Sequence, residues 1–259
     1  MLPTLFCPGC GNGILMKAMF EVFDEMGLES LDGFVFVSGI GCAGWIPSPH
    51  FKADSVHTLH GRAIPVATGI KLCRPELRVV VIGGDGDIAG IGCGHLIHAA
   101  RRNVDIATVM VNNFNYGMTG GQYSPTTPRG KITPTSPYGN PERPMDTCLL
   151  VAEAGANYVA RWTVAHYRML KEALKRLFEG RGFRFLEVVS TCPTRVLRRE
   201  GLTPAEGLKA LLRASVPVRR CDPARAVLKG RIPVGVYADR DEPGFLEALG
   251  LAGPGVRRG

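Results

Sequence analysis

Short apolar runs that alternate with helical patterns most constrain the fold of this chain. The runs are four to eight residues long, the length of buried strands, and cover residues 33–37, 78–82, 104–111, 158–161 and 183–189. Apolar side chains recur at helical spacing in the segments between or before them, at residues 11–26, 62–72, 88–101, 146–155 and 164–180. Strands that alternate with helices predict an α/β fold, a parallel sheet with helices on both faces.

The pattern divides the chain into two parts. Residues 1–194 carry the alternation and form the predicted sheet domain. Beyond them only residues 203–214 show a helical pattern, and the rest is rich in Arg, Pro and Gly. Residues 195–259 hold 13 Lys/Arg against 7 Asp/Glu, a net charge of +6. We therefore predict an irregular basic C-terminal arm, either simply solvated or attractive to an acidic protein partner.

Composition excludes several classes of partner and location. The basic residues of the arm are interrupted by Pro and Gly and lack interleaved aromatics, which disfavours nucleic acid. No apolar run is long enough to span a membrane. The first residues, MLPTLFCPGCGN, lack the basic and apolar regions of a secretory signal, so we expect a cytoplasmic protein.

Polar turns follow two of the predicted strands. Residues 78–82 run directly into Gly84-Asp85-Gly86-Asp87, and residues 104–111 run into Asn112-Asn113. Backbone N–H groups at the start of a helix bind phosphate oxygens, and carboxylate and amide oxygens suit magnesium. Gly and Asp alone are common in tight turns, but the pair of turns together predicts a magnesium-diphosphate site. The long stretch between residues 114 and 144 lacks apolar periodicity, which is typical of a functional loop.

Eight cysteines in a cytosolic chain indicate metal or redox chemistry rather than disulfides. Four of them lie in turns or at strand ends, namely Cys7, Cys10, Cys42 and Cys192. Spacing alone leaves zinc, an iron–sulfur cluster and a redox pair open.

These motifs resemble the beta subunits of the 2-oxoacid:ferredoxin oxidoreductases, from Phe6 to about Arg199. The matching segments follow the family's order: CPGCG, GIGC, HTLHGRAIPVATGIK, GGDGD, HLIHAARRN, NNFNYGMTGGQYSPTTP and CPT. The resemblance implies a thiamine-diphosphate-binding fold. The motif sequences are most similar to those of 2-oxoglutarate synthases. In one respect the chain departs from many members, which carry Lys or Arg shortly after the third cysteine where this chain has Ala43-Gly44-Trp45.

The resemblance also implies a set of site residues. It implies a [4Fe-4S] cluster on Cys7, Cys10, Cys42 and Cys192, and magnesium on Asp85, Asn113 and the main-chain carbonyl of Asn115. It implies that thiamine diphosphate is held by Ile40, Gly41, Cys42, Ala43, Gly86, Asp87, Gly117 and Met118. His60 is implied as a cofactor-facing catalytic residue.

The implied activity is oxidative decarboxylation of a 2-oxoacid with coenzyme A and ferredoxin, or its reverse, with 2-oxoglutarate favoured over pyruvate and other 2-oxoacids. In thiamine enzymes an activating Glu lies on a pyrimidine-binding domain that this chain lacks, so we expect an alpha subunit to supply it. Two alternatives remain: a thiamine enzyme without a cluster, and a zinc-stabilised binding module for an acidic partner.

Overall fold

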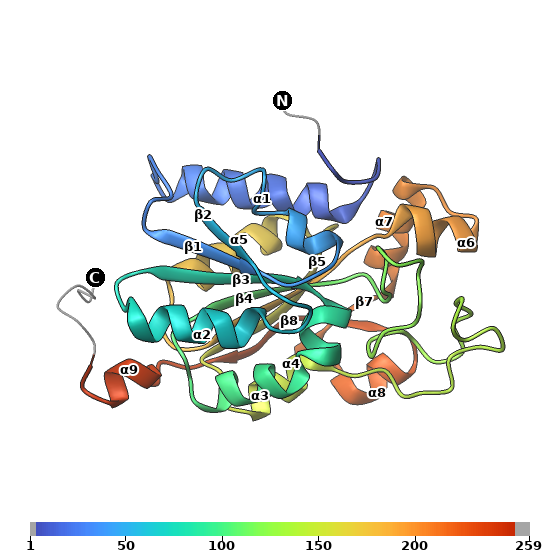
Figure 1. The fold of residues 1–259 in the computed structure, drawn as a ribbon. Coiled ribbons are helices and arrows are strands. Elements are labelled where there is room, and N and C mark those ends of the chain that lie inside the picture. The colour runs from blue at the N-terminus through green and yellow to red at the C-terminus, as the bar shows by residue number, and fades with distance from the viewer. Residues whose placement is uncertain (1–3, 252–259) are drawn as a thin grey trace.

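An eight-stranded sheet with helices on both faces dominates the computed structural model, which describes residues 4–251 (Figure 1). In chain order the strands are β1 (Phe34–Ser38), β2 (Asp54–His57), β3 (Arg78–Gly84), β4 (Ala107–Asn112), β5 (Tyr158–Thr163), β6 (Arg184–Val189), β7 (Ser215–Pro217) and β8 (Ile232–Asp239). Their order across the sheet is β2-β1-β3-β4-β6-β5-β8-β7. The first six are parallel, and β8 pairs antiparallel with β5 and parallel with β7.

The helices cover the two faces in separate groups. Their bounds are α1 (Gly11–Glu25), α2 (Ala63–Cys73), α3 (Cys93–Arg101), α4 (Thr147–Glu153), α5 (Tyr167–Glu179), α6 (Arg198–Glu200), α7 (Pro204–Ala214), α8 (Pro223–Leu228) and α9 (Phe245–Ala248). Helices α1 and α5 pack on one face of the sheet, whereas α2, α3 and α4 pack on the other (Figure 1).

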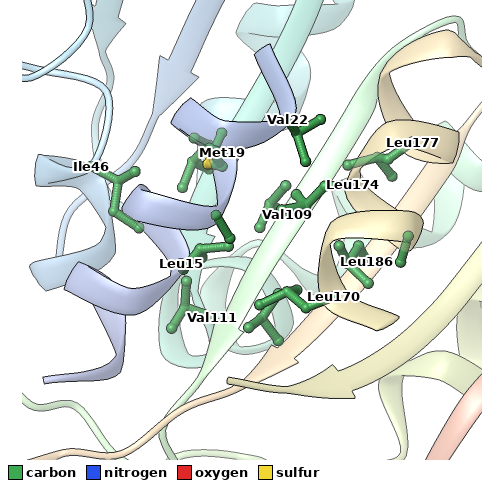
Figure 2. Close-up of a cluster of buried hydrophobic side chains, with 14 of the residues drawn as sticks. Leu15, Met19, Val22, Ile46, Val109, Val111, Leu170, Leu174, Leu177 and Leu186 are labelled. Carbon is green, nitrogen blue, oxygen red and sulfur yellow. The ribbon is translucent and has the colours of Figure 1, made fainter. Parts of the chain in front are cut away.

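The same residue spacing brings α1 and α5 onto the sheet. Leu15, Met19 and Val22 recur at intervals of four and three residues on α1, so they share one face of that helix. Leu170, Leu174 and Leu177 repeat the intervals on α5. Both rows are fully buried, and Figure 2 shows them against side chains of β4 and β6. Burying each such side chain stabilises the fold by about 1.5–3 kcal/mol, which fixes both helices on this face.

Register brings the strand ends together. Ser38 of β1 pairs with Ile82 of β3, Gly84 pairs with Val111 of β4, and Asn112 pairs with Val189 of β6. The carboxyl ends of these parallel strands therefore meet at one edge of the sheet, where ligands bind in such folds.

The structure confirms the predicted α/β fold and its parallel sheet, and the stretch 114–144 is irregular apart from isolated bridges. The irregular conformation predicted for residues 195–259 is wrong up to residue 251, because β7, β8 and α8 are regular and β8 pairs along β5. Residues 252–259 lie outside the described residues. Pro233 and Gly235 interrupt the apolar run of strand β8 and weaken its strand signal. Pairing with a distant strand decided its conformation.

Within residues 4–251 no helix combines the length and the apolar character that crossing a membrane requires. The cytoplasmic location stays a prediction.

Candidate cofactor site

The turn after β3 is closed by an aromatic ring. A Cβ atom on Gly86 would overlap the ring of Tyr116, and the hydroxyl of Tyr116 donates to the carbonyl oxygen of Gly86 at 3.3 Å. Only glycine leaves room for this contact. The chain can therefore turn from β3 into residues 86–91 while the loop after β4 covers the turn.

Asp85 lies in this turn with 1% of its surface exposed. Its Oδ2 atom accepts hydrogen bonds from Ser124 Oγ at 2.5 Å and Thr126 Oγ1 at 2.6 Å. Burial raises the pKa of Asp85 to about 6, although both hydroxyls favour the charged form. Such a carboxylate is poised for a cation, which would remove the cost of burying its charge.

Three oxygens meet beside Asp85. Asn113 Oδ1 lies 3.3 Å from Asp85 Oδ1 and 2.7 Å from the main-chain oxygen of Asn115. Turning the amide of Asn113 over would let it donate to both oxygens. A cation between the three oxygens would satisfy the present orientation equally well. In an octahedral magnesium site with ligands at about 2.1 Å, neighbouring oxygens are about 3.0 Å apart, so these spacings fit.

Asp87 joins three loops at the same edge. Its Oδ1 atom accepts hydrogen bonds from the backbone N–H groups of Gly61 at 2.7 Å and Ile40 at 3.3 Å. His60 Nδ1 lies 2.8 Å from the same oxygen, although its geometry falls outside that of a hydrogen bond. Burial raises the pKa of Asp87, and these backbone N–H groups and the nearby His60 oppose the rise. Asp87 thus holds the Ile40 and His60 loops against the turn after β3.

Two buried oxygens at this edge lack a hydrogen-bond partner among residues 4–251, namely Asp87 Oδ2 and Asn115 Oδ1. A buried acceptor without a donor costs about 1–3 kcal/mol. The edge therefore suits a bound group that brings donors.

The four predicted cysteines converge beside this edge. Burial is the largest effect that raises the pKa of Cys10 to about 12, and the Cys192, Cys42 and Cys7 thiols are near enough to add to it. A Cβ atom on Gly117 would lie 3.6 Å from Cys192 Sγ, 3.5 Å from Asn115 Oδ1 and 3.7 Å from Asn113 Nδ2. Gly117 thus lies beside both Cys192 and the side-chain amides of Asn113 and Asn115.

The thiols do not form a ready-made site for a single ion in the described part of the chain. Among residues 4–251, no three His, Cys, Asp or Glu side chains lie close enough to share one metal ion. Tetrahedral zinc needs each sulfur at about 2.3 Å. A cubane cluster instead takes one thiolate on each of four irons, which holds the sulfurs farther apart.

The remaining predicted residues surround the same edge. Ala43 is buried and Cys42 is half-buried in the short turn Cys42–Trp45, which follows Gly41 at a φ of 141°. Ile40 and Met118 are 49% and 44% exposed. Their side chains are open to solvent beside the cofactor loops.

Sequence reasoning missed the hydroxyls that hold Asp85. Ser124 and Thr126 lie in the predicted functional loop, where the polar run SPTTP between glycines and prolines was the available signal. It also missed a buried charged group behind the site, although Arg161 and Glu187 stand out as charges within two strongly apolar strands.

Glu187 anchors that buried group. Its Oε2 atom lies 2.8 Å from Arg161 Nη2, it accepts from Thr147, and its Oε1 atom accepts from Asn112 Nδ2 at 2.7 Å. Burial alone would raise the pKa of Glu187, but the charge of Arg161 and these hydrogen bonds lower it below its ordinary value. Asn112 in turn accepts from Thr126, the residue that holds Asp85.

Comparison with known proteins identifies the family. Residues 39–188 match the family described as "Thiamine pyrophosphate enzyme, C-terminal TPP binding domain". The chain is 46% identical to the 2-oxoglutarate synthase subunit KorB of Methanocaldococcus jannaschii over 96% of this chain and 92% of that protein. The chain belongs to the beta subunits of the 2-oxoacid:ferredoxin oxidoreductases.

Other members of this beta-subunit family agree in sequence and structure. The chain is 50% identical to the 2-oxoglutarate synthase subunit KorB of Archaeoglobus fulgidus over 82% of this chain and 76% of that protein. It is also similar to a solved 2-oxoglutarate:ferredoxin oxidoreductase from Magnetococcus marinus, with a TM-score of 0.83 and 34% identity. That match covers 96% of this chain and 88% of the other. The beta subunit is thus an enzyme subunit with a thiamine-pyrophosphate-binding domain.

Replacing Gly86 tests the closed turn. Gly86→Ala should lower the free energy of unfolding by about 1–3 kcal/mol, because the new methyl group overlaps the Tyr116 ring. The matched control is Gly94→Ala on α3, where a Cβ atom meets nothing within 4 Å. It should be neutral or raise the free energy by up to about 1 kcal/mol. Chemical denaturation measures both, and equal effects would contradict the crowded turn.

Removing Glu187 tests the buried charges. Glu187→Gln should lower the free energy of unfolding at neutral pH by about 3 kcal/mol, because Arg161 loses a buried partner. Since the pKa of Glu187 is lowered by folding, its contribution is present above its ordinary value of 4.5 and is lost as pH falls below it.

Chemical denaturation at neutral and at acidic pH should therefore show that acidification lowers the free energy of unfolding less in Glu187→Gln than in the wild type. Glu172→Gln, on the surface of α5 with 68% of its side chain exposed, is the control and should behave like the wild type. If acidification lowered the free energy of unfolding of Glu187→Gln as much as that of the wild type, Glu187 would not be a source of the acid sensitivity.

Proposed function

We propose that this chain is the catalytic beta subunit of a 2-oxoglutarate:ferredoxin oxidoreductase that contains thiamine diphosphate, magnesium and a [4Fe-4S] cluster. It would convert 2-oxoglutarate and coenzyme A to succinyl-CoA, carbon dioxide and reduced ferredoxin, or run the reverse reaction. One observation carries the proposal: Gly117 lies beside both Cys192 and the side-chain amides of Asn113 and Asn115, the residues next to Asp85. A cofactor held there would have a redox cluster beside it.

The proposed diphosphate site uses the loops at the strand ends. Asp85, Asn113 and the carbonyl of Asn115 would hold magnesium, which suits their converging oxygens. Thiamine diphosphate would lie against loop 40–43, Gly86 and Asp87, and loop 117–118. When bound, it supplies a nucleophilic carbon that allows the carboxylate next to a 2-keto group to leave.

His60 is proposed to act on the substrate. Its Nδ1 atom lies against the carboxylate of Asp87, so only Nε2 is left to meet a ligand. The side chain is 34% exposed, which leaves the ring accessible from the site. Its proposed role is to orient the substrate or to hold a proton at Nε2.

The proposed cluster takes one thiolate from each of Cys7, Cys10, Cys42 and Cys192. Such a cluster accepts electrons one at a time, as a ferredoxin-linked reaction requires. Cys42 follows Ile40 and Gly41 directly, so one short loop would touch both cofactors. The zinc-stabilised module is less well supported, because no three His, Cys, Asp or Glu side chains among residues 4–251 are arranged to hold one ion.

The choice of 2-oxoglutarate rests on the relatives. The Methanocaldococcus and Archaeoglobus proteins are named 2-oxoglutarate synthase subunits, and the Magnetococcus enzyme was solved with 2-oxoglutarate, coenzyme A and succinyl-CoA. One feature of the sequence favours a second candidate function, the oxidation of pyruvate or another 2-oxoacid. Ala43-Gly44-Trp45 supplies no cation for the second carboxylate of 2-oxoglutarate.

An alpha subunit is proposed to complete the site. Apolar side chains surround the cofactor loops on the surface: Ile40 at 49%, Trp45 at 42%, Leu59 at 79% and Met118 at 44% exposed. Exposed apolar groups beside a site mark a protein interface. The partner would bring the pyrimidine-binding domain and its activating Glu to this face.

Turnover of the assembled enzyme tests the function. Co-purified with its alpha subunit under anaerobic conditions, the chain should reduce ferredoxin only when 2-oxoglutarate and coenzyme A are both present. The chain alone should give no turnover. Pyruvate and branched 2-oxoacids serve as competing substrates, and faster turnover with pyruvate would replace the 2-oxoglutarate assignment. Turnover by the single chain would refute the need for an alpha subunit.

Cysteine replacement tests the cluster. Cys192→Ser should lose most of the bound iron and acid-labile sulfide, together with the brown absorbance of the cluster, because one of four thiolates is missing. Cys221→Ser is the matched control, since Cys221 lies far along the chain in the C-terminal segment and should leave the iron content unchanged. Stoichiometric zinc without iron in the wild type would overturn the cluster.

A further inference from the structure

A basic pocket opens beside the cysteines. It is lined by Gly120, Thr194, Arg195, Arg198 and Arg199, has a volume of about 350 Å³, and is called the arginine pocket below. All three arginines are exposed. None of the described residues that line the pocket is acidic, and the neighbouring Glu200 forms an ion pair with Lys131.

The arginine pocket adjoins the four thiols directly. Thr194 Oγ1 lies 3.6 Å from Cys7 Sγ, and Cys7 is exposed. Arg195 Nε donates to the carbonyl oxygen of Gly117 at 3.2 Å, and Gly117 is the residue beside Cys192. Arg195 is also close enough to Cys42 for its charge to oppose the rise that burial causes in the pKa of that thiol. The pocket is therefore a solvent-facing entrance to the cysteine group.

We propose that the arginine pocket is the docking surface for the acidic face of the small electron-carrier protein that oxidises this enzyme. The inference rests on the proposed function, because it places the carrier against the proposed cluster. One electron passes from the reduced cluster to the oxidised carrier in each encounter. No bond forms or breaks, and no proton moves.

Charge and exposure favour a protein over a small anion. Arg195 lies in the turn after Cys192, Arg198 and Arg199 lie on α6, and all three are exposed. A buried site would instead enclose an anion with desolvated donors. The positive charge of these three arginines speeds the approach of an acidic partner and holds it more tightly at low salt. An electron carrier must also approach its donor closely, and Cys7 is the exposed thiol of the four.

Charge reversal at Arg198 tests the docking surface. The wild-type and Arg198→Glu complexes with the alpha subunit are titrated with an oxidised acidic [4Fe-4S] ferredoxin by isothermal titration calorimetry. Arg198→Glu should weaken ferredoxin binding about tenfold at low ionic strength, and the difference should shrink at high ionic strength. The matched control is Arg101→Glu, an exposed arginine at the end of α3 near the opposite edge of the sheet, which should bind ferredoxin like the wild type.

Two results would overturn the inference. Equal ferredoxin affinity in Arg198→Glu and the wild type at low salt would exclude the arginine pocket as the docking surface. A raised KM for coenzyme A with unchanged ferredoxin affinity would assign the pocket to phosphate groups instead. Reduction of a small viologen dye with 2-oxoglutarate tests the proposed function separately, and Arg198→Glu should retain it. Loss of dye reduction in the wild type would therefore count against the function and not against the docking surface.

Discussion

A series of buried polar contacts connects the antiparallel pair of strands β5 and β8 to the carboxylate of Asp85. Arg161 on β5 contacts Tyr237 on β8 and Glu187 on β6, and Glu187 holds Asn112 at the end of β4. Thr126 then joins Asn112 to Asp85. Unpaired, each buried charge would cost several kcal/mol, so these partners must keep their positions. The rigidity of the site follows from that requirement.

The carboxylates of Asp85 and Asp87, two residues apart in the turn, make different contacts. Asp85 faces oxygens that suit a cation, whereas Asp87 accepts backbone N–H groups from loops that follow other strands. Asp87 thereby brings loop 40–43, which includes Cys42, close to the turn. The proposed redox group and the proposed diphosphate group share this edge because one short loop belongs to both. The arginine pocket beside Cys7 connects this edge of the sheet to the protein surface.

Much of the fold and of the candidate site could be predicted from the sequence. Particular residues show what could not be predicted. Apolar runs predicted the parallel strands, because burial on both faces imposes a local composition on residues such as those of β3 and β4. Strand β8 was not predicted, since its pairing with β5 joins segments about 75 residues apart and leaves little local signal. Ser124 and Thr126 were missed for a similar reason: a hydroxyl in a loop shows no sign of the carboxylate it will contact.

The sequence by itself determined the fold class, the family and the residue types at the strand ends, because periodicity and motif order are local properties of the chain. Only the tertiary structure decided which of those residues meet. It brought Cys7 and Cys10 from the start of the chain near Cys192, and it placed Gly117 beside Cys192 and the side-chain amides of Asn113 and Asn115. It also placed Arg195 and Arg198 beside the exposed Cys7 thiol. Such contacts depend on strand register and loop packing across the whole sheet, which no local pattern specifies.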